Sequence, residues 1–165
     1  MDQTLPIIRV RSNLGDWDGD GYDEVLVSAP FYDDGSDTDV GIVYVVDGNE
    51  KASLDLDSDA IAKIVGEDID DYAGWGLDGG GDFDGDGTAD ILVGAFNGET
   101  ATSRTNAGMA YLVLGPIAGT NSIASADVTF VGSQTNGLLG RDVALIGDMD
   151  NDADSELALA APYYK

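Results

Sequence analysis

Short apolar runs alternate with acidic, glycine-rich stretches along this 165-residue chain. The runs are a few residues long and rich in Val, Ile and Leu, which is typical of buried β-strands. No stretch of about ten residues keeps the 3.6-residue period of an amphipathic helix, so we expect almost no helix. The predicted strands cover residues 6–11, 24–29, 41–48 (with its turn), 61–65, 90–95, 108–116 and 127–132. Two glycine-marked strands are also predicted, at 73–77 and 139–143.

One acidic loop occurs three times, and an apolar strand follows it each time. The loops cover residues 16–24, 82–90 and 148–156. Each has acids at its first, third, fifth and ninth positions, and the first aspartates are spaced 66 residues apart. A fixed period of this length indicates a repeat protein whose units bury their apolar faces against their neighbours. The expected units are 1–66, 67–132 and an incomplete 133–165.

Four short strands per unit, with the loop between the first two, are the content of one β-propeller blade. We therefore expect an all-β fold built of four-stranded antiparallel blades, about 2.5 of them in this chain. The small residues after each loop, such as Gly94 and Ala95, suit a crowded position near a propeller axis. An incomplete propeller leaves bare strand edges, which natural proteins avoid. We expect the chain to belong to a longer polypeptide or to be completed by other copies of itself.

The spacing of the loop acids predicts calcium binding. Calcium takes six to eight oxygen ligands, and alternate residues of a tight turn aim their oxygens at one point. Positions one, three, five and nine supply carboxylates, and position seven supplies its backbone carbonyl. The predicted ligands are Asp16, Asp18, Asp20, Tyr22 and Glu24; Asp82, Asp84, Asp86, Thr88 and Asp90; and Asp148, Asp150, Asp152, Asp154 and Glu156. About three calcium sites are expected.

The third site is expected to be the weakest. Gly21 and Gly87 at position six permit the positive φ of a sharp turn, whereas the third loop has Ala153 there. An alanine in that conformation costs roughly 1–2 kcal/mol. Asn151 also replaces the glycine found at position four of the other loops.

Other interpretations of the loops are weaker. An EF-hand requires a glutamate at position twelve, but Val27, Val93 and Leu159 stand there, and strands follow instead of helices. Solvated acidic turns would also be rich in Asp and Gly, but three copies in fixed register favour a metal. An all-oxygen ligand set disfavours zinc and copper, and magnesium remains an alternative.

The charge balance restricts the partners. With 7 basic and 32 acidic residues the formal net charge is −25, which argues against nucleic acid and anionic membrane surfaces. No apolar run approaches the roughly 20 residues of a membrane-spanning helix, so no membrane insertion is expected. The chain has no histidine and no cysteine, and its regularly spaced acids are assigned to the loops. A catalytic constellation is therefore hard to assemble, and we expect no enzyme activity.

These features together resemble the FG-GAP repeat of integrin alpha-subunit propellers. The second half of the motif appears as Ser-Ala-Pro at 28–30, Gly-Ala-Phe at 94–96 and Ala-Ala-Pro at 160–162. The first half is degenerate, with Ala-Gly at 73–74 and Leu-Gly at 139–140, and the first unit has Ile-Ile at 7–8 instead. The resemblance implies a calcium-binding propeller located outside the cell or at its surface. It does not specify a ligand.

The resulting functional prediction is a calcium-binding structural or adhesion module that self-assembles or is part of a longer propeller. Expected partners are other copies, the rest of a longer chain, glycans or a cell-surface protein. A glycan-binding lectin and an accessory part of a secreted hydrolase are the alternatives. Trp17 and Phe83, which follow the first ligand of their loops, either form an exposed platform for sugars or pack between blades; the second interpretation is favoured.

Overall fold

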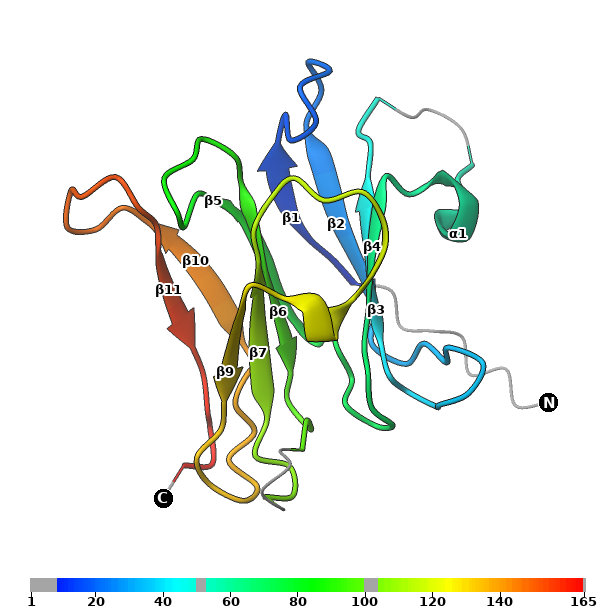
Figure 1. The fold of residues 1–165 in the computed structure, drawn as a ribbon, viewed down its shortest axis with the longest axis vertical. Helices are drawn as coiled ribbons and strands as arrows, with labels where there is room; N and C mark the ends of the chain where they lie inside the picture. Colours follow the sequence, from blue (N-terminus) through cyan, green and yellow to red (C-terminus); the bar gives the residue numbers. More distant parts are fainter. Residues whose placement is uncertain (1–8, 50–52, 100–103, 165) are drawn as a thin grey trace.

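The computed structural model describes residues 9–49, 53–99 and 104–164, and they form three sheets that lie side by side (Figure 1). The first sheet contains β1 (Arg9–Gly15), β2 (Glu24–Ala29), β3 (Ile42–Val46) and β4 (Ala62–Val65), joined as antiparallel neighbours. The second contains β5 (Gly76–Gly81), β6 (Asp90–Ala95), β7 (Met109–Val113) and β9 (Val128–Val131). The third contains β10 (Val143–Gly147) and β11 (Glu156–Leu159).

This arrangement is that of consecutive propeller blades, so the predicted all-β fold is confirmed. The first strands of the three sheets, β1, β5 and β10, pack against one another in order. Helix is limited, in the described ranges, to α1 (Leu56–Asp59) and one 3₁₀ turn (Ile123–Ser125). Both strands that follow the first two loops, β2 and β6, have the predicted bounds. Residues 6–8 of the first predicted strand, which was expected at 6–11, lie outside the described part of the chain.

Alternating side chains of the central strands fill two different cores. Leu26 of β2 packs with Val43, Ile64 and Ile91 between the first and second sheets. Its neighbour Val27 belongs to a separate cluster on the other face of the first sheet. Because a strand directs successive side chains to opposite faces, a continuous apolar run is what a blade with two covered faces requires.

The strands predicted at 73–77 and 139–143 are wrong in position, because β5 and β10 begin later and lead directly into the loops. The glycine-marked segments instead make the contact between blades. Ala73 forms an isolated parallel bridge with Gly41, and the corresponding bridge joins Leu139 to Gly108. Such a sharp passage between sheets needs the left-handed conformation that glycine adopts at no steric cost, as Gly74 does with a φ of +85°.

The crowding around the small residues after the loops comes from these segments of the next blade. A Cβ on Gly94 would lie 1.9 Å from the carbonyl oxygen of Gly140. At the corresponding place in the first blade, the buried Ser28 hydroxyl donates a hydrogen bond of 2.8 Å to the carbonyl oxygen of Gly74. These positions therefore set how closely consecutive blades stack.

The connection between β7 and β9 contains a strand that the sequence did not predict, β8 (Gly119–Ser122). Figure 1 shows this yellow segment crossing from the second sheet to the first, where β8 pairs in parallel with β4. Ile123, directly after β8, is 2% exposed and lies in the core between the two sheets. The second blade thus covers the outer edge of the first.

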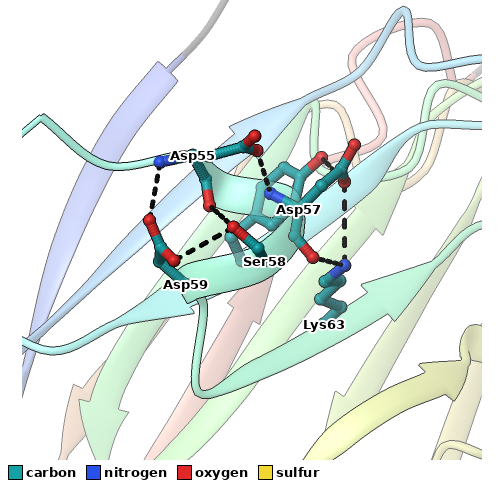
Figure 2. A network of polar contacts seen from close by, with 6 residues as sticks. Asp55, Asp57, Ser58, Asp59 and Lys63 are labelled. Atoms are coloured by element: carbon teal, nitrogen blue, oxygen red, sulfur yellow. Dashed lines mark hydrogen bonds and ion pairs between the residues drawn. The ribbon is translucent and has the colours of Figure 1, made fainter.

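A polar network holds α1 against the first sheet (Figure 2). Asp55 caps the helix by accepting the Asp57 N–H, and the Asp59 carboxylate in turn accepts the Asp55 N–H. Asp57 also accepts a hydrogen bond from the Tyr44 hydroxyl and lies 3.7 Å from the Lys63 ammonium. These contacts join α1 to β3 and β4, so this short helix is fixed by its surroundings rather than by its own length.

Candidate metal centre

The three acidic loops project from the same end of the three sheets, each between the first and second strand of its blade (Figure 1). Each loop is closed by hydrogen bonds from its own backbone to its acids. The carboxylate at position one accepts the N–H of position six in all three: Gly21 to Asp16 at 3.1 Å, Gly87 to Asp82 at 2.9 Å, and Ala153 to Asp148 at 3.1 Å. The repeat in sequence is therefore also a repeat in loop geometry.

The carboxylate at position nine folds back over each loop. It accepts the N–H of position two every time: Trp17 to Glu24 at 2.5 Å, Phe83 to Asp90 at 2.6 Å, and Met149 to Glu156 at 2.6 Å. The first residue of the following strand thus carries an acid back towards the loop acids. This closure concentrates negative charge at one end of each blade.

The structure brings several of the predicted ligands together, with one oxygen from each within 4.8 Å of the others. These groups are Asp16, Asp18 and Glu24; Asp82, Asp84 and Asp86; Asp148, Asp150, Asp152 and Glu156; and Asp20, Glu24 and Asp47. The group in the second loop does not include Asp90, and Asp20 is grouped apart from Asp16 and Asp18. Asp47 is a member that sequence reasoning missed.

The position-seven residues were predicted to bind through their backbone carbonyls. The Tyr22 side chain is 48% exposed, and Thr88 is half-buried beside the cleft between the first two loops. Asp154 has a carboxylate oxygen 2.6 Å from where a Cβ on Gly85 would stand, so it lies against the second loop.

Glu24 provides the test of whether a cation fits the first loop. Its side chain is 0% exposed, and its Oε2 accepts N–H bonds from Trp17 and Asp18. Its Oε1 is buried and has no hydrogen-bond partner among the residues that the structure describes. Burial raises the pKa of Glu24, and the two N–H donors lower it. A buried carboxylate oxygen without a partner is costly, and a calcium ion would satisfy it. The first loop therefore fits the predicted ion.

Asp90, at the same position of the second loop, is satisfied without a cation. It is also 0% exposed, but its Oδ1 accepts the Gly115 N–H at 2.9 Å while its Oδ2 accepts the Phe83 N–H. Burial raises the pKa of Asp90, and these two donors lower it. In the second blade, cation binding would rest on Asp82, Asp84 and Asp86.

The third loop has the backbone conformation that was expected to weaken it. Ala153 has a φ of +85° and Asn151 a φ of +66°, where the other loops have glycine. Four carboxylates nevertheless converge there, more than in either other loop. The predicted ranking of the sites stays a prediction, because backbone strain and ligand convergence oppose each other in this loop.

Consecutive loops also contact one another. The Ser155 N–H of the third loop donates to the carbonyl oxygen of Asp82 at 2.7 Å. Trp17 of the first loop is 5% exposed, and its Nε1 donates to the carbonyl oxygen of Ala89 at 2.7 Å. Trp17 therefore packs between blades, as favoured, and the interpretation as an exposed sugar platform is wrong for it. Phe83 is half-buried and packs against the core between the second and third sheets.

Comparison with known proteins agrees with this geometry. A family model described as the FG-GAP repeat matches residues 13–46 and 73–113. The chain carries FG-GAP repeats. Each match spans one acidic loop with the strands on both sides of it, and the third loop lies outside both matched segments.

Three named proteins are similar to this chain over about nine tenths of its length. Human integrin alpha-IIb is 29% identical over 154 residues, which is 91% of this chain and 14% of the integrin. Phosphatidylinositol-glycan-specific phospholipase D of Dictyostelium discoideum is 28% identical over 164 residues, covering 90% of this chain and 17% of that protein. The bovine phospholipase D of the same name is 30% identical over 156 residues and is covered to 18%. The chain thus spans less than a fifth of the length of each of these three relatives.

Proposed function

We propose that the chain is a calcium-binding, non-enzymatic propeller segment that serves extracellular adhesion or structure. The observation that carries the calcium assignment is the buried Oε1 of Glu24 in the acidic first loop, which has no hydrogen-bond partner in the described part of the chain. Carboxylates held this close repel one another, and a divalent cation between them removes the repulsion. The repeated loop geometry extends the assignment to the second and third blades.

The adhesion assignment rests on the likeness to integrin alpha chains and on the surface of this chain. A net charge of −25 is unsuited to anionic partners. Among the described residues, no helix combines the length and apolarity that crossing a bilayer requires. We propose an extracellular or cell-surface location, with a cell-surface protein or glycan as the external partner.

Further propeller strands are the second proposed partner. Within the described residues, β11 pairs only with β10, whereas every full blade has four strands. The free edge of β11 offers unpaired N–H and C=O groups, which favour addition of another strand. The strands would come from a longer polypeptide or from a second copy. Sedimentation in calcium tests the second source: a monomer of 17.1 kDa at all concentrations would contradict self-assembly.

Calcium removal tests the main proposal. Free calcium at 100 times its dissociation constant adds about 2.7 kcal/mol of stability per independent site. Thermal unfolding followed by circular dichroism should therefore show a large fall in Tm when EDTA replaces calcium. Asp84→Asn should reduce this difference, while Asp142→Asn, an exposed acid outside the loops, should leave it unchanged. Equal melting curves in calcium and EDTA would refute calcium binding.

A further inference from the structure

Asp47 stands directly across from Glu24 in the first sheet. The antiparallel pairing of β2 and β3 places Val25 opposite Val46, so the residue before Val25 faces the residue after Val46. Directly opposed positions of an antiparallel pair direct their side chains to the same face, with Cβ atoms about 4.5–5.5 Å apart. Asp47, directly after β3, therefore lies beside the first acidic loop although it belongs to a different hairpin.

The two carboxylates and Asp20 form a compact group. One oxygen from each lies within 4.8 Å of the other two. Asp47 itself is half-buried and accepts the Asn49 N–H, which fixes its turn. Like charges placed directly opposite one another destabilise a sheet. Glu24 adds a second cost, because its buried Oε1 has no partner among the described residues.

The second blade shows the same corner without this group. There Ile91 pairs with Val113, so Asp90 faces Leu114 where Glu24 faces Asp47. Asp90 has both carboxylate oxygens satisfied by backbone N–H groups. Of these two blades, the first has an acid opposite the buried carboxylate and leaves one carboxylate oxygen without a partner among the described residues, and the second has neither feature. A bound cation would both reduce the repulsion between Glu24 and Asp47 and supply a partner for the Glu24 Oε1.

We propose that Asp47 is a cation ligand, which together with Asp20 and Glu24 holds a divalent cation between the first acidic loop and the end of β3. The inference rests on the proposed calcium binding and extends it to a residue outside the repeated loop. Hard cations of the size of calcium suit this group, because it offers carboxylate oxygens alone and calcium accepts six to eight ligands. The bound cation would link the β1–β2 hairpin to β3, so that the first blade gains more from calcium than the second.

Terbium luminescence can measure this site separately from the others. Tb³⁺ replaces calcium on carboxylate ligands and emits strongly when a nearby tryptophan absorbs the light. Trp17 lies at position two of the first loop, where the other loops have Phe83 and Met149. Trp75 precedes β5 at the end away from the loops, about 20 Å from them by the rise of a strand. Excitation at the long-wavelength edge of tryptophan absorption avoids Tyr22 of the same loop, and Trp17→Phe should then remove the sensitised signal.

Asp47→Asn is the decisive variant, and Asp127→Asn is its control. Asp127 is an exposed acid that accepts the Leu114 N–H at the corresponding corner of the second blade, and asparagine can still accept it. We expect Asp47→Asn to weaken terbium and calcium binding at the first blade about tenfold or more, through the loss of ligand charge. Asp127→Asn should leave both affinities unchanged. In EDTA, Asp47→Asn should melt no lower than the parent chain, because the variant removes a repulsion.

The possible results distinguish the role of Asp47 from calcium binding by the chain as a whole. Unchanged affinity in Asp47→Asn, with normal binding by the parent chain, would overturn the role of Asp47 alone. A lower Tm of Asp47→Asn in EDTA would overturn it too, since the aspartate would then have a structural role without the cation. Absence of any sensitised signal or calorimetric calcium binding in the parent chain would overturn both.

Discussion

Asp71 should make the stability of this protein depend on pH, and Asp71→Asn should remove that dependence. Its side chain is only 5% exposed, in the segment between β4 and β5, at the end of the blades away from the acidic loops. Burial raises the pKa of Asp71 to about 7, and the negative charges of Asp68, Glu99, Glu67 and Asp70 add to the shift. Burial also raises the pKa of Tyr111, and Asp71 is the first of the charges that add to it.

The direction in which the unfolding free energy changes with pH follows from proton binding to Asp71. Between the unfolded pKa of 3.8 and the folded value of about 7, the folded chain holds a proton on Asp71 that the unfolded chain has released. The free energy of unfolding therefore falls as pH rises through this window. A difference of about 3 pKa units corresponds to a loss of about 4 kcal/mol between pH 4 and pH 8. This is a large part of the 5–15 kcal/mol that typically stabilises a domain.

Urea denaturation from pH 4 to pH 8 at fixed ionic strength measures this loss. Asp71→Asn should match the parent chain near pH 4 and exceed its unfolding free energy by about 4 kcal/mol at pH 8. Acids that do not interact with Asp71 cancel in the difference between the two proteins, so the difference reports Asp71 together with its four acidic neighbours. The exposed Asp142→Asn variant should follow the parent curve. A parent-minus-variant difference that does not change with pH would refute the assignment.

Three further substitutions test the contacts that fix the blades and the third loop. Gly94→Ala should lower the unfolding free energy by about 1–3 kcal/mol in urea denaturation, because its Cβ would overlap the Gly140 carbonyl; an unchanged midpoint would contradict this packing. Ser28→Ala should cost about 1–3 kcal/mol in the same assay, since the Gly74 carbonyl loses its buried donor; Ser36→Ala, an exposed serine, is the control. Ala153→Gly should raise the unfolding free energy by roughly 1 kcal/mol and strengthen calcium binding by the third loop in calorimetry, because it relieves the backbone strain at φ +85°. No gain in either quantity would contradict the strain.

Sequence predicted the parts of the fold that depend on local pattern. β2 and β6 combine a continuous apolar run with an acidic loop before it, and both their bounds were predicted correctly. The 66-residue period then transferred each assignment from one unit to the next. The prediction placed β5 too early in the sequence, because Gly79, Gly80 and Gly81 at the end of the strand have no side chains to show a strand pattern. Their place in the sheet is decided by pairing with β6.

The elements that sequence missed are held by distant partners. β8 reads Gly-Thr-Asn-Ser, which has no apolar alternation, and its strand conformation comes from pairing with β4 of the previous blade. α1 has four residues, too few for a helical period, and is fixed by the Tyr44 and Lys63 contacts. Local propensity cannot indicate structure that another part of the chain imposes.

The same division applies to the candidate site. Most of the acids that converge belong to one loop each, so spacing along the chain was enough to predict them. Asp47 was missed because it is near Glu24 only across the sheet, although both strands were predicted. Aligning the predicted strands by the register of a hairpin would have paired the two acids. The signal was present in the sequence, but only as a relation between two strands.

Contacts between loops would couple the proposed cation binding to blade stacking. The Trp17 indole donates to Ala89 of the second loop, and the Ser155 N–H of the third loop donates to Asp82 of the second. A cation that orders one loop therefore also orders the surface on which the next blade packs. Asp82 takes part in both, because its carboxylate belongs to a candidate cation site while its backbone carbonyl accepts a hydrogen bond from the neighbouring blade. Blades joined in this way should gain and lose their cations together with their packing, so unfolding in EDTA should remain a single transition at a lower temperature, rather than the separate loss of one blade.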